Sequence, residues 1–139
     1  MATSPVPGDI VPFLRYADPR AAIDWLGQAF GFAPILVVDD DEGGVAHAEL
    51  RLGSSAIMLG GVKEDVLGMV TPAAAGGATQ GVYLVAADAD ALWVRARTAG
   101  AKVVINLYDT PYGSREFTVR DPEGHLWSVG TYRAGSWEG

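Results

Sequence analysis

The sequence contains no cysteine, and only two of its 139 residues are histidine. Disulfide bonds, thiolate chemistry and cysteine-bound zinc are therefore excluded. Basic residues are also scarce, because ten Lys and Arg stand against seventeen Asp and Glu, for a formal charge of −7. Nucleic acid and anionic membranes attract positively charged surfaces, so neither is expected as a partner.

Long apolar runs are absent as well. No stretch of the sequence reaches the roughly 18–20 apolar residues that a membrane-spanning helix needs. Residues 1–8, MATSPVPG, have neither the basic start nor the apolar centre of a secretory signal. We therefore expect a cytoplasmic protein. Hydrophobic residues make up 49% of the chain, which is enough to build the core of one domain spanning residues 1–139.

A predicted β-hairpin near the C-terminus is the clearest local pattern. Apolar and polar residues alternate around Phe117 and Val119, and a second run extends over residues 125–131. Between them, DPEG at 121–124 has Asp, Pro and Gly at the positions that a type I turn favours. A hairpin is marginally stable alone, so we expect it to join a larger sheet.

The rest of the chain predicts two similar halves. Asp18 and either Asp88 or Asp90 are expected to cap two helices, which end at Gly31 and Gly100. Asp18 and Asp88 lie 70 residues apart and the two glycines lie 69 apart, an offset that indicates an internal repeat. The further strands expected are 10–16, 35–38, 45–52, 55–59, 82–86 and 102–107. The first module then covers about 9–60, a linker 61–78, and the second module about 79–133.

Several stretches of this chain resemble the vicinal-oxygen-chelate superfamily, which includes glyoxalase I, bleomycin-resistance proteins and extradiol dioxygenases. They are DPEGHLW with the preceding FTVR, VYLVAAD, PFLRYADPRAAIDWLGQAFGF and AHAELRLGSSAIML. Together they cover roughly residues 10–132. The resemblance implies an α+β fold in which two βαβββ modules form a curled mixed sheet around a cleft. It also implies helices on the outer face and pairing of two chains as a homodimer.

The positions that hold metal ligands in this superfamily carry unsuitable residues here. The resemblance places a His or Gln seven residues before each helix cap, where this chain has Val11 and Gly81. It places Glu four residues past each hairpin glycine, where this chain has Ile57 and Ser128. Three of these side chains have no donor atom, and a serine hydroxyl is a poor ligand. We therefore predict no metal ligand and no cofactor, so that Lewis-acid chemistry is lost.

Strand alternation predicts which residues face the cleft. His47 and Glu49 share one face of their strand, and Ala48 and Leu50 share the face that should lie under a helix. A His/Glu pair at this spacing suits solvation of a cleft, contact with a ligand, or a base with its partner. We assign no catalytic residue. The residues expected to bind a small-molecule ligand are Phe13, His47, Glu49, Tyr83, Thr118 and Ser128.

Other residues with a possible role in chemistry receive structural interpretations. Trp127 is expected in the core, and His125 is expected as a solvated residue of the hairpin turn. Trp25 and Trp93 are expected to be half-exposed on the helices. The acidic run 39–42 lacks the spaced oxygen ligands of a calcium loop and is expected to be a solvated turn.

Two hypotheses about function follow, besides a third in which the chain binds no ligand and serves only as a dimerisation or interaction unit. The first is a metal-free protein that binds a small molecule and sequesters a drug or a metabolite, as in antibiotic resistance. The missing ligands favour this binding role over an enzyme. The alternative is a lyase, isomerase or dioxygenase of the same superfamily, with a divalent metal held by displaced ligands such as His47, Glu49, Gln80 or Glu116.

Overall fold

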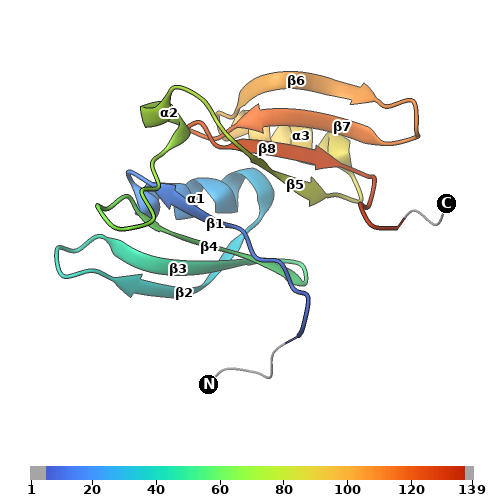
Figure 1. The fold of residues 1–139 in the computed structure, drawn as a ribbon. Helices are drawn as coiled ribbons and strands as arrows, with labels where there is room; N and C mark the ends of the chain where they lie inside the picture. Colours follow the sequence, from blue (N-terminus) through green and yellow to red (C-terminus); the bar gives the residue numbers. More distant parts are fainter. Residues whose placement is uncertain (1–5, 137–139) are drawn as a thin grey trace.

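Two βαβββ modules make up the fold in a computed structural model that describes residues 6–136. The first module contains β1 (Phe13–Tyr16), α1 (Pro19–Phe30), β2 (Ala33–Asp39), β3 (Val45–Leu52) and β4 (Ser55–Gly61). The second contains β5 (Gly81–Val85), α3 (Ala89–Thr98), β6 (Lys102–Asp109), β7 (Arg115–Arg120) and β8 (Leu126–Gly130). A short helix, α2 (Pro72–Ala75), lies between them (Figure 1). No helix of the described residues has the length and apolarity needed to cross a membrane.

Each module forms its own four-stranded mixed sheet. The strand orders are β1-β4-β3-β2 and β5-β8-β7-β6, with β1 parallel to β4 and β5 parallel to β8. The remaining pairs are antiparallel. This confirms the α+β fold with two βαβββ modules. A curled sheet enclosing a cleft stays a prediction.

The helices begin and end where the sequence indicates. The Asp18 carboxylate accepts a hydrogen bond from the Ala21 amide at 3.1 Å, and Asp88 accepts one from Ala91 at 3.0 Å. These contacts satisfy amides that have no partner inside the helix. Asp88 is therefore the second cap. Gly31 and Gly100 both adopt a left-handed conformation (φ 91° each) just past the ends of α1 at Phe30 and of α3 at Thr98.

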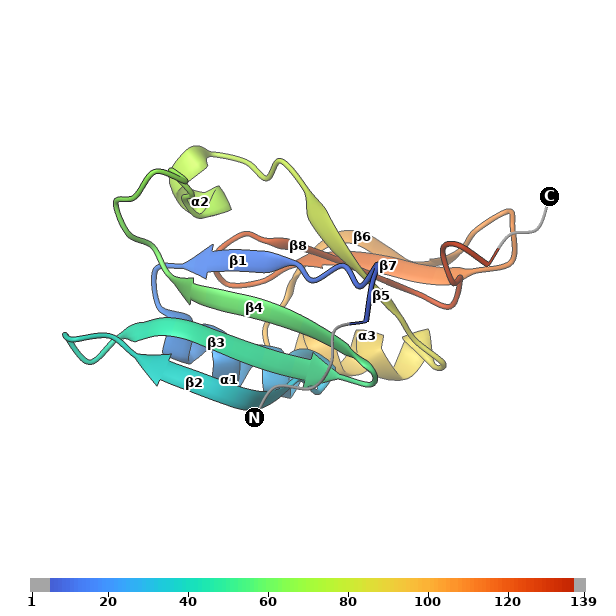
Figure 2. The ribbon, with the colours of Figure 1, turned by 60° about the horizontal axis from the view of Figure 1, so that its bottom comes forward.

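One face of each sheet is covered by its helix, and the two helices also pack against each other (Figure 2). Trp25 on α1 is only 9% exposed, and its indole N–H donates to the Ala99 carbonyl beyond the end of α3 at 2.8 Å. Arg95 on α3 donates to the carbonyls of Gln28 and Gly27. The expected half-exposure of Trp25 is therefore wrong, because this side chain joins the two helices. Trp93 is partly buried against Phe117.

The hairpin turn of the second module docks on the first module. Its Asp121 side chain is 4% exposed and accepts from the Tyr16 hydroxyl at 2.6 Å and from the Trp127 indole at 3.0 Å. Glu123 accepts from the amides of Ala17 and Asp18, at the junction between β1 and α1. The two modules are therefore fastened together by charge-assisted hydrogen bonds, which are stronger than neutral ones.

His125 also takes part in this contact. Its Nε2 atom lies 2.9 Å from the Arg15 carbonyl oxygen, and its ring lies 4.7 Å from the Tyr16 ring. The interpretation of His125 as a solvated turn residue is therefore wrong. The turn itself is as predicted, because the Gly124 amide donates to the Asp121 carbonyl at 2.9 Å.

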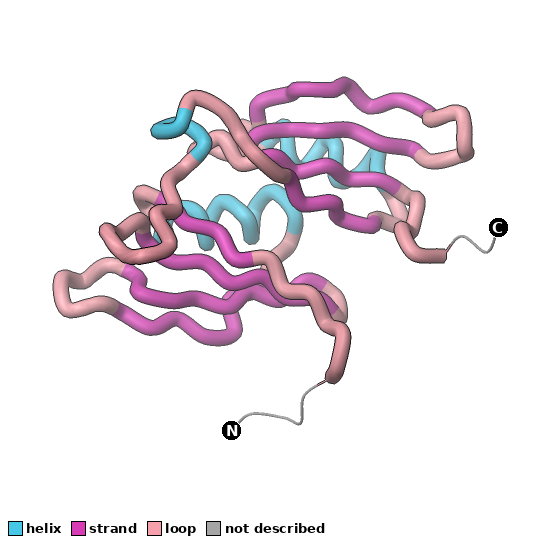
Figure 3. The backbone as a smooth tube through the Cα atoms, viewed as in Figure 1, coloured by secondary structure: helices cyan, strands magenta, loops and turns pink. Residues whose placement is uncertain are grey.

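The segment between the modules, predicted as a linker, contains helix α2 (Figure 3). The Thr71 hydroxyl caps this helix by accepting from the Ala74 amide at 3.2 Å. The Ala73 amide donates to the carbonyl of Glu123 in the hairpin turn. The segment is thus attached to the same turn that fastens the modules.

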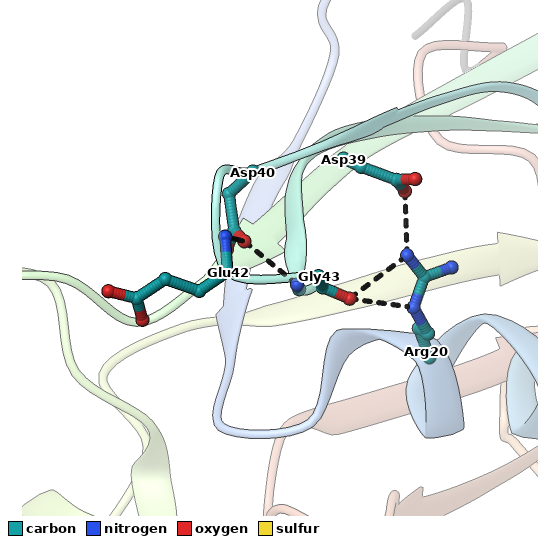
Figure 4. A network of polar contacts seen from close by, with 6 residues as sticks. Arg20, Asp39, Asp40, Glu42 and Gly43 are labelled. Atoms are coloured by element: carbon teal, nitrogen blue, oxygen red, sulfur yellow. Dashed lines mark hydrogen bonds and ion pairs between the residues drawn. The ribbon is translucent and has the colours of Figure 1, made fainter.

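The acidic run closes the β2–β3 hairpin as a solvated turn. The Asp40 carboxylate accepts from the amides of Glu42 and Gly44, each at 2.8 Å. Arg20 on α1 contacts both the Asp39 carboxylate, at 2.6 Å, and the Gly43 carbonyl (Figure 4). Arg20 of the same module thus pairs with one of the acidic residues of this turn.

Replacing Tyr16 by Phe tests the contact between the modules. The change removes the hydroxyl donor from a buried carboxylate, so we expect the free energy of unfolding at pH 7 to fall by about 1–3 kcal/mol. Urea denaturation followed by circular dichroism measures it. Tyr108→Phe is the matched control, because Tyr108 is 41% exposed. Equal stability of the two variants would contradict the assignment.

Burial of Tyr16 also predicts that the free energy of unfolding depends on pH, and the same two variants test this. Burial raises the pKa of Tyr16 well above the ordinary value of 10.0, and the Asp121 charge raises it further. The folded protein therefore retains a proton that the unfolded chain releases above about pH 10. Above that pH, the free energy of unfolding of the unmodified protein should fall by up to about 1.4 kcal/mol per pH unit because of Tyr16. The Tyr16→Phe variant should lack this contribution.

Candidate functional site

The face of each sheet opposite its helix is uncovered, and we call it the open face. Along β3, Ala48 and Leu50 are fully buried towards the helix, while His47 and Glu49 are partly exposed. Along β8, Trp127 and Val129 are fully buried and Ser128 is not. Alternation in the strands thus places the polar residues on the open faces, as the sequence predicts.

The strand pairing relates the two open faces residue by residue. Phe13 pairs with Met58 in the first sheet, and Tyr83 pairs with Ser128 in the second. Glu49 also pairs with Met58, as Thr118 pairs with Ser128. His47 and Glu116 stand two residues before Glu49 and Thr118 on their strands. The equivalent pairs are therefore Phe13/Tyr83, His47/Glu116, Glu49/Thr118 and Met58/Ser128.

All six predicted ligand-binding residues belong to these eight positions, three in each module. Sequence reasoning left out Met58 and Glu116 from that set. The repeat offset of 69 or 70 residues would have identified both, because Met58 lies 70 residues before Ser128 and Glu116 lies 69 after His47.

The open face of the first sheet presents one coupled polar pair. His47 Nε2 lies 2.9 Å from a carboxylate oxygen of Glu49, and both side chains are more than a third exposed. Arg15 on β1 is tied instead to Asp65, at 3.2 Å. A groove of about 420 Å³ runs past this pair, lined by Phe13, Arg15, His47, Met58, Gly60 and Lys63 among others.

A second hollow of about 270 Å³ lies at the junction of the modules, beneath the segment that carries α2. It shares Phe13 with the groove and is also lined by Met69, Val70, Gln80 and His125. Gln80 therefore lines this hollow, whereas His47 lines the groove. The hollow is lined mainly by apolar residues and the groove adds the polar side chains of Arg15, His47 and Lys63, a combination that occurs in small-molecule sites.

The open face of the second sheet is dominated by hydroxyl groups. Thr118 and Ser128 hydrogen-bond across the strands at 2.7 Å. The Tyr83 hydroxyl lies 3.0 Å from Glu116 and 2.9 Å from the Tyr132 carbonyl, so its one proton serves one acceptor at a time. Partial burial raises the pKa of Tyr83, and the hydrogen bond and charge of Glu116 also raise it. The phenol thus stays a proton donor at neutral pH.

Gly130 makes the contact between Tyr83 and Glu116 possible. A Cβ atom built on Gly130 would collide with the Tyr83 hydroxyl and lie 2.8 Å from Glu116 Oε2. Any larger residue at position 130 would therefore force these two side chains apart.

The residues at the superfamily's metal positions do not fit a metal. Val11 carries only hydrocarbon, Gly81 has no side chain, and the Ser128 hydroxyl is engaged by Thr118. The fourth position needs a correction: Ile57 is 3% exposed and faces the helix, while Met58 occupies the open face. A thioether is a soft ligand and does not replace a carboxylate. Within residues 6–136 no three His, Asp or Glu side chains converge as a metal site would require.

Comparison with known proteins agrees with this architecture. The family model described as Glyoxalase/Bleomycin resistance protein/Dioxygenase superfamily matches residues 10–129. Uncharacterized proteins of Mycobacterium bovis and Mycobacterium tuberculosis are 36% identical to the chain over 121 residues, which are 86% of this chain. Those residues span 80% of the first protein and 71% of the second.

Among solved structures, TioX from Micromonospora sp. ML1 is 32% identical with a TM-score of 0.71, over 91% of this chain and 99% of TioX. TnmS3, an antibiotic binding protein from Streptomyces sp. CB03234, has a TM-score of 0.67 over 91% of this chain and 97% of its own. Because the two sequences are only 17% identical, this similarity shows a shared fold alone. The chain therefore belongs to the glyoxalase/bleomycin resistance protein/dioxygenase superfamily.

Proposed function

We propose that this protein binds a small organic molecule on its open faces and holds it without chemical change. The observation that carries the proposal is the set of eight equivalent positions, which present hydroxyl, imidazole, carboxylate and aromatic groups to solvent. Such groups orient a ligand by hydrogen bonds and stacking. The lack of imidazole and carboxylate groups at the metal positions favours binding over metal-assisted catalysis.

The ligand class that we propose is a drug or metabolite with a flat, aromatic or cationic body. The acidic chain attracts cations, and Phe13 and Tyr83, 49% and 38% exposed, present rings at equivalent places. That TnmS3 is an antibiotic binding protein supports sequestration of an antibiotic as the example. His47, Glu49, Thr118 and Ser128 would then supply the polar contacts.

We also propose that two copies of the chain pair through the outer strands. Ile35, Leu36, Val37 and Val38 on β2 are each 40–47% exposed, so both faces of that strand are uncovered. Val103, Val104 and Ile105 on β6, the equivalent strand, are 38–47% exposed. Contiguous exposed apolar residues mark an interface, and a two-fold axis lets one such patch cover its own counterpart. A second copy is therefore the occupant that we propose.

Ligand binding is tested by isothermal titration with bleomycin, the flat cation ethidium and neutral coumarin. We expect at least one of them to bind and Ser128→Leu to weaken that binding about tenfold or more, because the new side chain fills the open face beside Tyr83. Ser54→Leu in the exposed β3–β4 turn is the matched control and should bind normally. If all three ligands fail to bind, or if both variants bind equally, the proposed site is wrong.

Metal content separates binding from the enzymatic alternative. We expect elemental analysis of the purified protein to find well below one zinc, nickel, iron or manganese ion per chain, because His47 and Glu49 supply only two ligands and stable sites need at least three. Activity toward hemithioacetals or catechols after addition of metal would overturn the proposal.

Pairing of chains is tested by sedimentation velocity. We expect a dimer at micromolar concentration and a monomer for Val37→Lys combined with Val104→Lys, because each change places a charge in the apolar contact. Val66→Lys is the control, since Val66 is fully exposed in the segment between the modules. A monomer for the unmodified protein at every concentration would refute the pairing.

A further inference from the structure

Glu116 is the one carboxylate at the eight open-face positions that hydroxyl groups hold in place. Tyr83 and Ser114 lie 3.0 and 2.9 Å from its Oε2 atom, and the Tyr112 hydroxyl lies 3.4 Å from each carboxylate oxygen. Ser114 is 2% exposed and accepts from the Tyr132 amide, which fixes its hydroxyl. Hydroxyl groups from two segments of the chain, β5 and the loop 110–114, therefore converge on this side chain.

This carboxylate has no cationic partner within residues 6–136, whereas several other acids of the chain do. Asp65 pairs with Arg15. Arg115, the neighbour of Glu116 in the sequence, is engaged by Asp90 at 2.9 Å and by Asp109 at 3.4 Å. The second open face thus presents a negative charge that neutral hydroxyls orient and that no cation of the described residues neutralises.

The surroundings of Glu116 fit a protonated amine. Among the residues that the structure describes, Oε1 has only the distant Tyr112 hydroxyl as a donor, so its lone pairs are available. The oxygens of Tyr83 and Tyr112 can accept N–H bonds while donating their own protons. The Tyr112 and Tyr132 rings meet edge to face at 5.5 Å beside the carboxylate, and aromatic rings attract organic cations.

The contact between Tyr83 and Glu116 requires the absence of a side chain at Gly130. Its missing side chain leaves room for Tyr83 and Glu116 to cross the β8 backbone in contact with each other. Gly130 does not adopt the left-handed conformation that favours glycine. The close approach of Tyr83 and Glu116 is therefore the physical reason for a glycine at this position.

We propose that Glu116, with Tyr83, Tyr112 and Ser114, forms a subsite for the ammonium group of an organic amine. This inference rests on the proposed function, because it names the chemical group that the second open face would recognise. Glu116 supplies the charge, the tyrosine hydroxyls orient it and accept N–H bonds, and Gly130 provides the room.

The test compares 2-phenylethylammonium with 2-phenylethanol, which differ only in the charged group. Both are titrated into the full-length ¹⁵N-labelled protein at pH 7 and constant ionic strength. We expect the amine to bind about tenfold more tightly than the alcohol, the effect of one charge-assisted contact. The amides of Tyr83, Ser114, Glu116 and Tyr132 should shift with the amine.

Glu116→Gln should bring the affinity of the amine close to that of the alcohol, because the amide keeps the shape and loses the charge. Glu42→Gln is the matched control: it removes the same charge from the exposed β2–β3 turn and should leave amine binding unchanged. If Glu116→Gln fails to fold, Tyr112→Leu replaces it. Tyr112 is 63% exposed, and its loss should weaken amine binding several-fold.

Different failures have different meanings. If amine and alcohol bind the second open face equally, the ammonium subsite is overturned while the binding function stands. If neither shifts that face, the subsite is overturned, and the antibiotic titrations alone decide the function. Equal weakening by Glu116→Gln and Glu42→Gln would mean a general charge effect and would also overturn it. A Glu116→Gln variant that alters sedimentation and leaves amine binding intact would assign the carboxylate to the contact between copies.

Discussion

The buried Asp121 carboxylate is the interaction on which the arrangement of the two modules depends. Its Oδ2 atom accepts from Tyr16 and Trp127, and its Oδ1 atom accepts from the amides of Glu123 and His125. A buried charge is tolerated when its hydrogen bonds are complete, and these four donors meet that condition. One side chain therefore shapes the hairpin turn, anchors the core tryptophan and contacts the other module.

Fastening the modules at this turn has a consequence for the site. The turn joins β7 to β8, the two inner strands of the second sheet, and contacts the end of β1, an edge strand of the first sheet, so the two sheets are held together by the same few bonds. The helices meet behind them through Trp25 and Arg95. Both open faces are thus attached to one continuous hydrophobic core, and Phe13 lies where the groove on the first face meets the hollow between the modules.

Much of this fold could be predicted from the sequence, because local signals agree with one another. The caps at Asp18 and Asp88, the DPEG turn and the alternation around His47 and Ser128 each depend on nearby residues. What failed depends on contacts between modules. A turn histidine has no local signal that a distant carbonyl will bind it, and nothing in α1 alone shows that Trp25 will reach the end of α3.

Counting four residues past the hairpin glycine selected Ile57, which faces the helix, for a specific reason. In the first module Leu52 pairs with Ser55 across a two-residue turn, while in the second Arg120 pairs with Leu126 across five residues. A fixed distance from the turn glycine therefore reaches opposite faces of the two last strands. Pairing register corrects this, and it also brings Met58 and Glu116 into the site.

The two halves keep one geometry and differ in chemistry at equivalent positions. The first open face presents Phe13, His47, Glu49 and Met58, while the second presents Tyr83, Glu116, Thr118 and Ser128. On the first face the acid is paired with an imidazole, and on the second the acid is held by hydroxyls. An internal repeat with identical residues would present the same groups twice. If the open faces bind a ligand as proposed, this divergence would give each face its own preference, and a molecule contacting both would be recognised in one orientation.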